Sequence, residues 1–403
     1  MQLGKFRKLL VREWQQIVLY AVLLAAAGGA LWYKLGTLTG GYSAAELHTA
    51  QAATSWQHIF HNPLDAPFLV LLRVLAYIND HSLFLARVVA MGCGLLTVGL
   101  FYGLVRYWHG ERTALFGTIL FATSAWFLHT ARIGTPDVLL FGLLALVACY
   151  IWLKRTSSGL ALLLSFILVA ALLYVPGMVW FIVLGIVAQW RTVDRQFKKN
   201  LWAVTAGGVL LVAALVPLGL AIYHDPQIAK VYAGLPAHGW PMPLDVLKNL
   251  LQVPVQLFLH GPATPEHWLG KVPVLDYFTA TMFFLGGYLY VRHAKLGRFW
   301  LFAGILIIGT VLVSLGGAVG LSIIVPIIYM IAASGVGFML DRWLTVFPRN
   351  VIAQGVGIGL ISAAVLATSI YSLRHYFVAW PSAPPTKAIF TVPDTAVSVT
   401  IKK

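Results

Sequence analysis

Apolar runs of about 20 residues recur along the whole chain, separated by short polar segments. Within each run the hydrophobic residues are continuous rather than alternating, which is typical of transmembrane helices and excludes a transmembrane barrel. We expect about eleven such helices. Their approximate ranges are 15–35, 84–107, 113–131, 137–154, 158–173, 176–190, 201–223, 276–292, 298–315, 319–340 and 351–373.

Composition supports this interpretation, because 60% of the 403 residues are hydrophobic and only 10% are charged. The net charge of +15 does not indicate a nucleic-acid partner, since the basic residues lie at the ends of apolar runs rather than in one patch. Cys93 and Cys149 both lie inside apolar runs and form no ligand or disulfide pattern. The sequence therefore predicts an all-α polytopic membrane protein.

The distribution of charge predicts the orientation. Lys and Arg are concentrated in the short loops on the side of the basic N-terminal segment, so we expect the N-terminus in the cytoplasm. The first run is expected to be an uncleaved anchor. An odd number of spans then places the C-terminus outside. Most acids and histidines fall on the outer side, which indicates an outer-face site.

The expected organisation is one transmembrane domain, residues 1–373, followed by a short extracytoplasmic tail, residues 374–403. Two outer loops are long, 36–83 and 224–275. Loops of this length are usually functional or disordered. The first contains an apolar stretch, 67–77, that is too short to span and is expected to lie along the membrane surface.

The first candidate site is Glu46 with His48, just after the first span. A carboxylate at the mouth of a membrane cavity can act as general base on a hydroxyl, and burial near lipid raises a carboxyl pKa toward a useful value. The alternative is a helix-capping or solvated loop acid. Glu46 and His48 could also share a metal, although two ligands do not make a site.

The second candidate is the turn between the third and fourth spans. Asp137 follows Pro136 at a helix start, where the helix dipole favours an anion. A purely structural role at the helix start is therefore sufficient to explain Asp137. Arg132 ends a span on the outer side, against the trend of the other basic residues. Arginine suits bidentate phosphate binding, and snorkelling to lipid headgroups is the alternative.

Two further segments carry weaker signals. The stretch 260–276 contains Glu266, His267 and Lys271, but by composition alone it is a loop before a helix. His58 and His61 have a metal-ligand spacing on a helix, without a third ligand in sequence.

Three stretches resemble the GT-C class of glycosyltransferases, multispanning enzymes that use lipid-linked sugars and include protein O-mannosyltransferases and bacterial aminoarabinose transferases. The first is Ala45-Glu46-Leu-His-Thr-Ala. The second and densest extends from Leu85-Ala-Arg87 to Ala131-Arg132-Ile-Gly-Thr-Pro-Asp137. The third is the loop from Gly261 to Asp276, and the tail from Arg374 to Trp380 is similar to the family's ending.

The resemblance implies inverting transfer of a sugar from a polyprenyl-phosphate donor to an acceptor on the outer face. Glu46 would be the catalytic base. Arg132, Arg87 and Lys271 would bind the donor phosphate, and His48, Asp137, Glu266 and His267 would support the site. No cofactor is firmly implied; a divalent metal bound by Glu46, His48 or Asp137 stays open.

One departure from the family pattern keeps other functions open. The family places an Asp-Glu pair where this chain has Ala45-Glu46, so one acid is missing. A catalytically degenerate scaffold protein and a transporter or flippase for lipid-linked sugars are therefore alternatives. The sugar, the acceptor (protein, lipid or polysaccharide) and the oligomeric state are left open. The expected location is the plasma or inner membrane.

Overall fold

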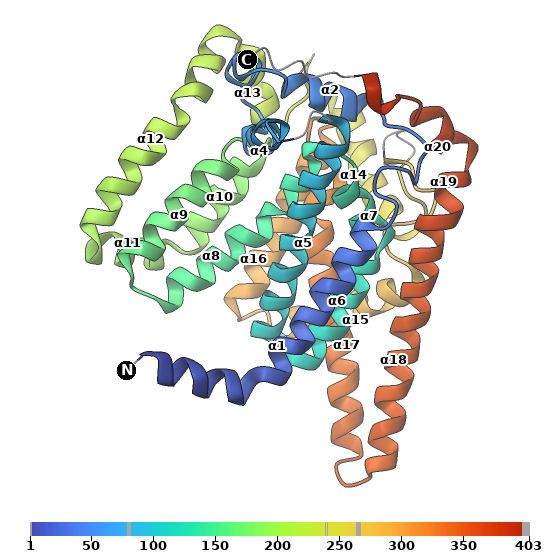
Figure 1. Ribbon diagram of the computed structural model, residues 1–403. Helices are drawn as coiled ribbons and strands as arrows, with labels where there is room; N and C mark the ends of the chain where they lie inside the picture. Colours follow the sequence, from blue (N-terminus) through green and yellow to red (C-terminus); the bar gives the residue numbers. More distant parts are fainter. Residues whose placement is uncertain (1, 79–81, 238, 240, 263–266, 397–403) are drawn as a thin grey trace.

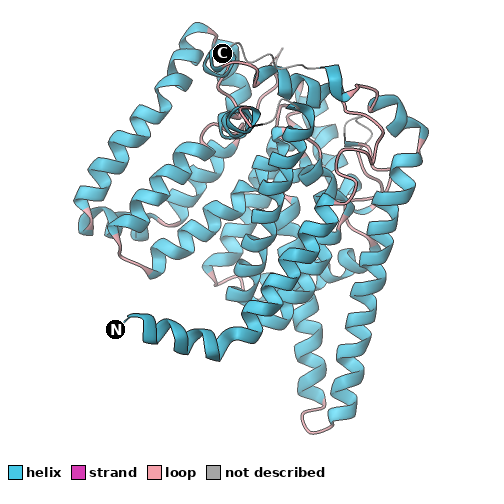
Figure 2. Cartoon of the chain, in the orientation of Figure 1, coloured by secondary structure: helices cyan, strands magenta, loops and turns pink. Residues whose placement is uncertain are grey.

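The computed structural model describes residues 2–78, 82–237, 239, 241–262 and 267–396, and the described chain is almost entirely helical (Figure 2). The one β pairing within these residues is an isolated bridge between Tyr42 and Val392. The prediction of an all-α protein is confirmed.

Every predicted apolar run is helical in the structure. The corresponding elements are α1 (Gln2–Trp32), α5 (Ser82–His109), α6 (Glu111–Thr123) with α7 (Ala125–Arg132), η1 (Pro136–Phe141) with α8 (Gly142–Arg155), α9 (Gly159–Leu172), α10 (Met178–Ala188), α12 (Leu201–His224), α15 (Tyr277–Arg292), α16 (Gly297–Ser314), α17 (Val325–Val346) and α18 (Val351–Arg374). Among the described residues, six helices are long and apolar enough to cross a membrane, or seven with one bent pair counted as a span. The total of eleven spans and the orientation of the termini stay predictions.

The bent pair is α6 and α7, which the sequence predicted as one uninterrupted span. The two helices meet at Ser124 with a bend of 62°. The Ser124 hydroxyl donates to the Phe121 carbonyl at 2.8 Å and accepts the Phe127 amide at 3.3 Å. The side chain thus replaces lost backbone hydrogen bonds at the break, as an N-cap does. The bend redirects α7, so that its last residues reach the loops at one end of the bundle.

Close backbone contact fixes the centre of the bundle. α17 is buried over most of its length and packs against α15. A Cβ atom added at Gly286 would lie 1.9 Å from the Ile331 carbonyl oxygen, and one at Gly335 would lie 2.0 Å from the Met282 carbonyl oxygen. Glycine at these two crossings lets the helices approach each other, as at many transmembrane interfaces.

Short helices gather at one end of the bundle. They are α2 (Ala44–Ala52), α3 (Trp56–His61), α4 (Ala66–Ala76), α13 (Pro226–Tyr232) and α14 (Pro243–Phe258). Figure 1 shows α2, α4 and α13 near the C-terminus, whereas the N-terminus and α11 (Trp190–Lys199) lie away from that end. α4 is the helix expected at 67–77; its position along a membrane surface stays a prediction. α14 was not predicted, because the segment 224–275 reads as a loop.

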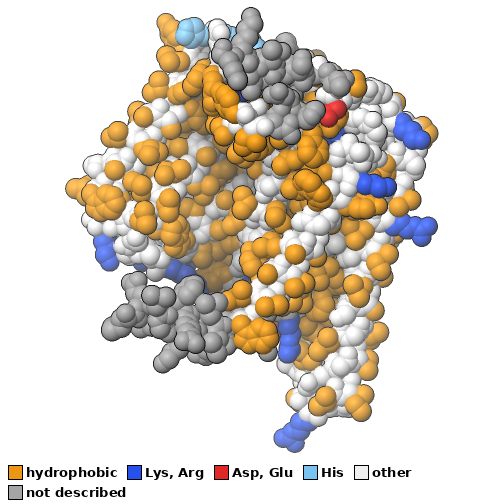
Figure 3. Space-filling model, viewed as in Figure 1, with side chains coloured by type: hydrophobic (Ala, Val, Ile, Leu, Met, Phe, Trp, Pro, Cys, Tyr) orange, Lys and Arg blue, Asp and Glu red, His pale blue; other side chains and the backbone are white. Residues whose placement is uncertain are grey.

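Large hydrophobic side chains are exposed along the bundle. Figure 3 shows them over the flank of the helices, as expected for a surface that contacts lipid tails. Trp202, Val209 and Val212 on α12 are each more than half exposed. The chain is a multi-pass membrane protein.

The C-terminal segment folds back over the loops at one end of the bundle. α18 continues through a π-helical turn, η4 (His375–Ala379), into α19 (Trp380–Ser382), α20 (Pro384–Ile389) and η5 (Asp394–Ala396). The Trp380 Nε1 donates to the Trp268 carbonyl at 2.8 Å. Tyr42 and Val392 exchange backbone hydrogen bonds of 2.8 and 3.0 Å. The tail therefore holds two loops that are far apart in sequence.

Candidate active site

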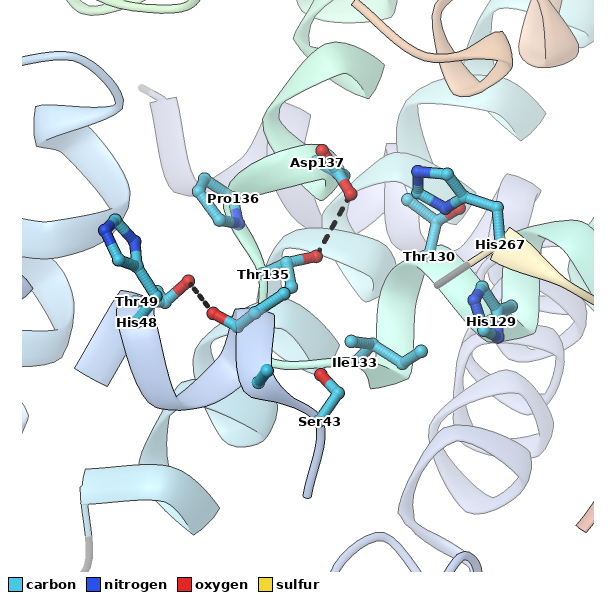
Figure 4. Close-up of a pocket in the computed structure, with 12 residues that line it drawn as sticks. Ser43, His48, Thr49, His129, Thr130, Ile133, Thr135, Pro136, Asp137 and His267 are labelled. Carbon is cyan, nitrogen blue, oxygen red and sulfur yellow. Dashed lines mark hydrogen bonds between the residues drawn. The ribbon is translucent and has the colours of Figure 1, made fainter. Parts of the chain in front are cut away.

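A cavity of about 470 Å³ lies among the loops at the end of the bundle where α2 lies. Its walls come from three separate segments, residues 43–49, residues 129–137 and His267. Figure 4 shows their side chains around one hollow, with His48 on one side and Asp137 and His267 on the other. The structure thus brings together parts of the three segments that the sequence singled out.

Asp137 is the residue that places a carboxylate on the wall of this cavity. Pro136 begins η1 and Asp137 follows it, so the fixed backbone of proline orients the turn. The Thr135 hydroxyl donates to Asp137 Oδ2 at 3.2 Å. Asp137 is half-buried, and no other described Asp or Glu lines the cavity. Among the described residues only the Thr135 hydroxyl donates to this carboxylate, so Asp137 keeps the capacity to accept a proton at the cavity wall.

Asp65 is a second carboxyl near Asp137 that sequence reasoning missed. It stands before α4 in a left-handed conformation, φ 57°, and its amide donates to the Tyr174 carbonyl at 2.9 Å. Burial, and to a smaller extent the negative charge of Asp137, raise the pKa of Asp65 to about 8. No local pattern signals this pair, because it results from the packing of α4 against η1.

Glu46 lies behind the cavity wall with its side chain fully buried. It closes a capping box at the start of α2, in which Ser43 N–H donates to Glu46 Oε2 at 2.8 Å. Oε1 accepts the Gly134 amide at 2.9 Å. Arg87 donates to both oxygens, from Nε at 2.6 Å and from Nη2 at 2.9 Å. All of the carboxylate's main acceptor directions are therefore occupied by protein.

Arg87 donates a hydrogen bond from each of its three guanidinium nitrogens. Besides Glu46, it donates to the carbonyls of Leu35 at 3.0 Å and Gly41 at 2.9 Å. Its guanidinium carbon lies 4.1 Å from the centre of the Tyr42 ring. The predicted roles of Glu46 as base and Arg87 as phosphate ligand stay untested. In the structure, the two residues together join α2, α5 and the turn at Gly134.

Arg132 differs from Arg87, because part of its guanidinium has no protein partner. It is the last residue of α7 and is 3% exposed. Nη2 donates to the Tyr33 carbonyl at 2.5 Å, whereas Nε and Nη1 are buried without a hydrogen bond. The guanidinium lies over the rings of Phe377, at 4.7 Å, and Tyr376, at 5.4 Å. Unpaired buried donors of this kind suit an anionic ligand.

The other predicted residues are more dispersed. Lys271 is exposed in a turn with φ 62° and does not line the cavity. His48 is exposed at the cavity, and the rings of His129 and His267 lie 6.4 Å apart on its other side. Glu266 lies outside the described residues.

The predicted metal ligands do not form a metal site. Within the described part of the chain, no three His, Cys, Asp or Glu side chains are grouped as ligands would be. Glu46 is bound to Arg87, and His48 and Asp137 stand on different sides of the hollow (Figure 4).

Comparison with known proteins identifies the architecture. Residues 61–220 match the family model of dolichyl-phosphate-mannose-protein mannosyltransferase. No curated protein sequence matches the chain. ArnT from Cupriavidus metallidurans in the apo state aligns with a TM-score of 0.56 and 15% identity, over 92% of this chain and 76% of that one. The same protein bound to undecaprenyl phosphate aligns with a TM-score of 0.54 and 14% identity, over the same shares.

The chain has the GT-C fold. The resemblance predicted from its motifs is thereby confirmed. The segment matched by the family model contains Arg87, Arg132 and Asp137, but neither Glu46 nor His267. In this chain the cavity therefore combines matched and unmatched segments, and its wall carries Ala45 where the resembling family has an acid.

Proposed function

We propose that this protein transfers a sugar from a polyprenyl-phosphate donor to an acceptor hydroxyl, with inversion, in the cavity among the outer loops. The observation that carries the proposal is the placement of Asp137 on the cavity wall five residues after Arg132, whose Nε and Nη1 are buried and unpaired. A proton acceptor and a phosphate ligand are the two groups that such a transfer needs most.

In the proposed reaction the acceptor oxygen attacks the anomeric carbon of the sugar from the side opposite the phosphate. The bond between that carbon and the phosphate oxygen breaks as the new glycosidic bond forms. The hydroxyl proton passes to Asp137, and polyprenyl phosphate leaves with one more negative charge than it had in the donor. The unpaired donors of Arg132 stabilise that charge.

Glu46 was predicted from the sequence as the base, but we propose a different role for it. Its oxygens already accept hydrogen bonds from Arg87, Ser43 and Gly134. Taking up a proton there would weaken a buried ion pair. We assign Glu46 as a positioning residue that holds the α2 wall against the turn before Asp137, and Asp137 as the base.

The lipid-linked donor is supported by the fold. The ArnT structure with the same fold is described as bound to undecaprenyl phosphate. A long apolar tail needs a path within the bilayer, and the exposed apolar flanks of the bundle offer lipid-facing surface. Assignment of the cavity to the outer face of the inner or plasma membrane follows from the charge distribution of the loops.

One observation favours a second candidate, a non-catalytic family member. Ala45 lines the cavity, so a methyl group stands where the family pattern places a carboxylate. If the chemistry of the class depends on that carboxylate, the chain would bind a donor without turning it over.

One experiment distinguishes the transferase from the non-catalytic family member. The purified protein in lipid is incubated with a panel of polyprenyl-phosphate sugars, and release of free polyprenyl phosphate is followed together with donor binding. We expect turnover with at least one donor. Binding without any release would contradict the transferase and support the non-catalytic member.

A further inference from the structure

A second polar cavity lies at the opposite end of the bundle. It has a volume of about 130 Å³ and is lined by His109, Tyr290, His293, Arg298 and Ser334, together with two leucines. His109 ends α5, and Arg87 stands near the other end of the same helix. The 22 residue steps from Arg87 to His109 correspond to roughly 33 Å along the helix axis, so this cavity is separate from the candidate active site.

The charge of this cavity is entirely positive or neutral. Its lining contains one arginine and two histidines but no Asp or Glu. Arg298 donates to the Trp108 carbonyl through Nη1 at 3.4 Å, and its guanidinium lies 5.6 Å from the centre of the Tyr290 ring. It forms no ion pair with any described residue. Most of its donors are therefore available to an anion.

Two other side chains are oriented by the protein. His109 Nε2 and the Tyr290 hydroxyl lie 2.9 Å apart. His293 Nδ1 lies 2.9 Å from the Leu289 carbonyl oxygen, which fixes its ring at the cavity edge with Nε2 directed away from the backbone. Lys295, two residues on, is exposed and adds positive charge nearby. The volume is several times the ~30 Å³ of one water molecule, enough for a phosphate group.

The surroundings indicate where the phosphate comes from. Val291, Leu296 and Trp300 flank the site and are 64, 42 and 67% exposed. Exposed tryptophan beside basic residues is typical of the boundary between lipid tails and headgroups. Basic pockets between transmembrane helices at this level bind anionic lipid headgroups.

We propose that the cavity around Arg298 binds the phosphate of an anionic phospholipid in the leaflet opposite the candidate active site. Arg298 pairs with the phosphate, His293 Nε2 forms the second contact, and the acyl chains lie along the exposed apolar residues of α15 and α16.

The test measures lipid binding by purified protein in detergent, with phosphatidylglycerol, phosphatidylcholine and inorganic phosphate as probes. We expect phosphatidylglycerol to bind in preference to phosphatidylcholine, and Arg298→Gln to weaken it at least fivefold. Arg349→Gln removes an exposed arginine on the α17–α18 loop and should leave binding unchanged. His293→Gln changes an exposed side chain, and should weaken binding without affecting folding.

Three results would overturn the proposal. Unchanged phosphatidylglycerol binding in both Arg298→Gln and His293→Gln would show that this cavity does not bind the lipid. An equal loss in Arg349→Gln would show a diffuse charge effect. Binding of inorganic phosphate that depends on Arg298, without binding of phosphatidylglycerol, would assign the site to free phosphate rather than lipid.

Discussion

Glu46 and Arg87 form a two-point ion pair across 41 residues of sequence, with Nε–Oε1 and Nη2–Oε2 distances of 2.6 and 2.9 Å and side chains that are 0 and 3% exposed. The pair joins the start of α2, on the cavity wall, to α5. Because Gly134 N–H donates to the same carboxylate, it also fixes the turn that leads to Asp137. The ion pair therefore determines the shape of the cavity without facing it.

Glu46→Gln should destabilise the protein. The change leaves the Arg87 guanidinium buried without its counter-charge, and breaking such a pair costs about 3–5 kcal/mol. Thermal unfolding in detergent measures the loss. The matched control is Asp194→Asn, which breaks the exposed Lys198–Asp194 pair and should cost less than about 1 kcal/mol. A Glu46→Gln protein that unfolds normally but has lost all turnover would instead identify Glu46 as the base.

Arg132→Gln should separate function from stability. Removing the charge relieves the buried, unpartnered Nε and Nη1 but loses the Nη2 bond to the Tyr33 carbonyl, so the unfolding temperature should change little. Donor turnover should fall about 10²–10³-fold, as when an oxyanion ligand is lost. Steady-state kinetics on the donor give this value, and Arg374→Gln, an exposed arginine at the end of α18, should keep full turnover. Equal turnover in both variants would exclude Arg132 as the phosphate ligand.

Asp65 should make stability depend on pH. Its pKa is raised from 3.8 to about 8, so the folded state holds a proton that the unfolded state releases above about pH 4. Stability contributed by the protonated carboxyl is present at low pH and is lost progressively as the pH rises from about 4 to about 8. The unfolding temperature of the wild type should therefore fall between pH 5 and pH 9, and that of Asp65→Asn should fall less. A parallel dependence in both proteins would contradict the assignment.

Trp380 should connect the tail to the cavity. Its ring is buried against His129, at 5.2 Å, and stacked on Tyr376, at 5.0 Å, while its Nε1 holds the loop at Trp268. Trp380→Ala should destabilise the protein by about 3–5 kcal/mol and reduce donor turnover, because His129 and the loop carrying His267 lose their support. Trp300→Ala, at an exposed position, should change neither. Loss of stability with unaltered turnover per folded molecule would show that the tail has no part in shaping the site.

The positions of the helices were predictable because continuous apolar runs have few alternatives in a membrane. The break at Ser124 was not predictable, because a single serine inside an apolar run is compatible with an uninterrupted transmembrane helix. α14 was missed because its amphipathic pattern contains Pro254 and lies in a segment rich in turn residues.

The site was predictable only in part. The motifs containing Glu46, Arg132 and Asp137 pointed to the right segments, since these do meet near one cavity. Which carboxylate faces the cavity depends on the side of α2 that packs inward, and the capping box with Ser43 turns Glu46 away from it. The approach of Asp65 to Asp137 is a tertiary contact that no local pattern contains.

The central claim is that Asp137 takes the acceptor proton. The direct test is the turnover of a polyprenyl-phosphate sugar by Asp137→Asn under saturating donor and acceptor, with donor affinity measured separately. Asp245→Asn, which changes an exposed acid in the first turn of α14, is the control. If Asp137 has this role, turnover by Asp137→Asn should fall about 10²–10⁴-fold with unchanged donor affinity, and the control should keep wild-type turnover. Wild-type turnover by Asp137→Asn would contradict it.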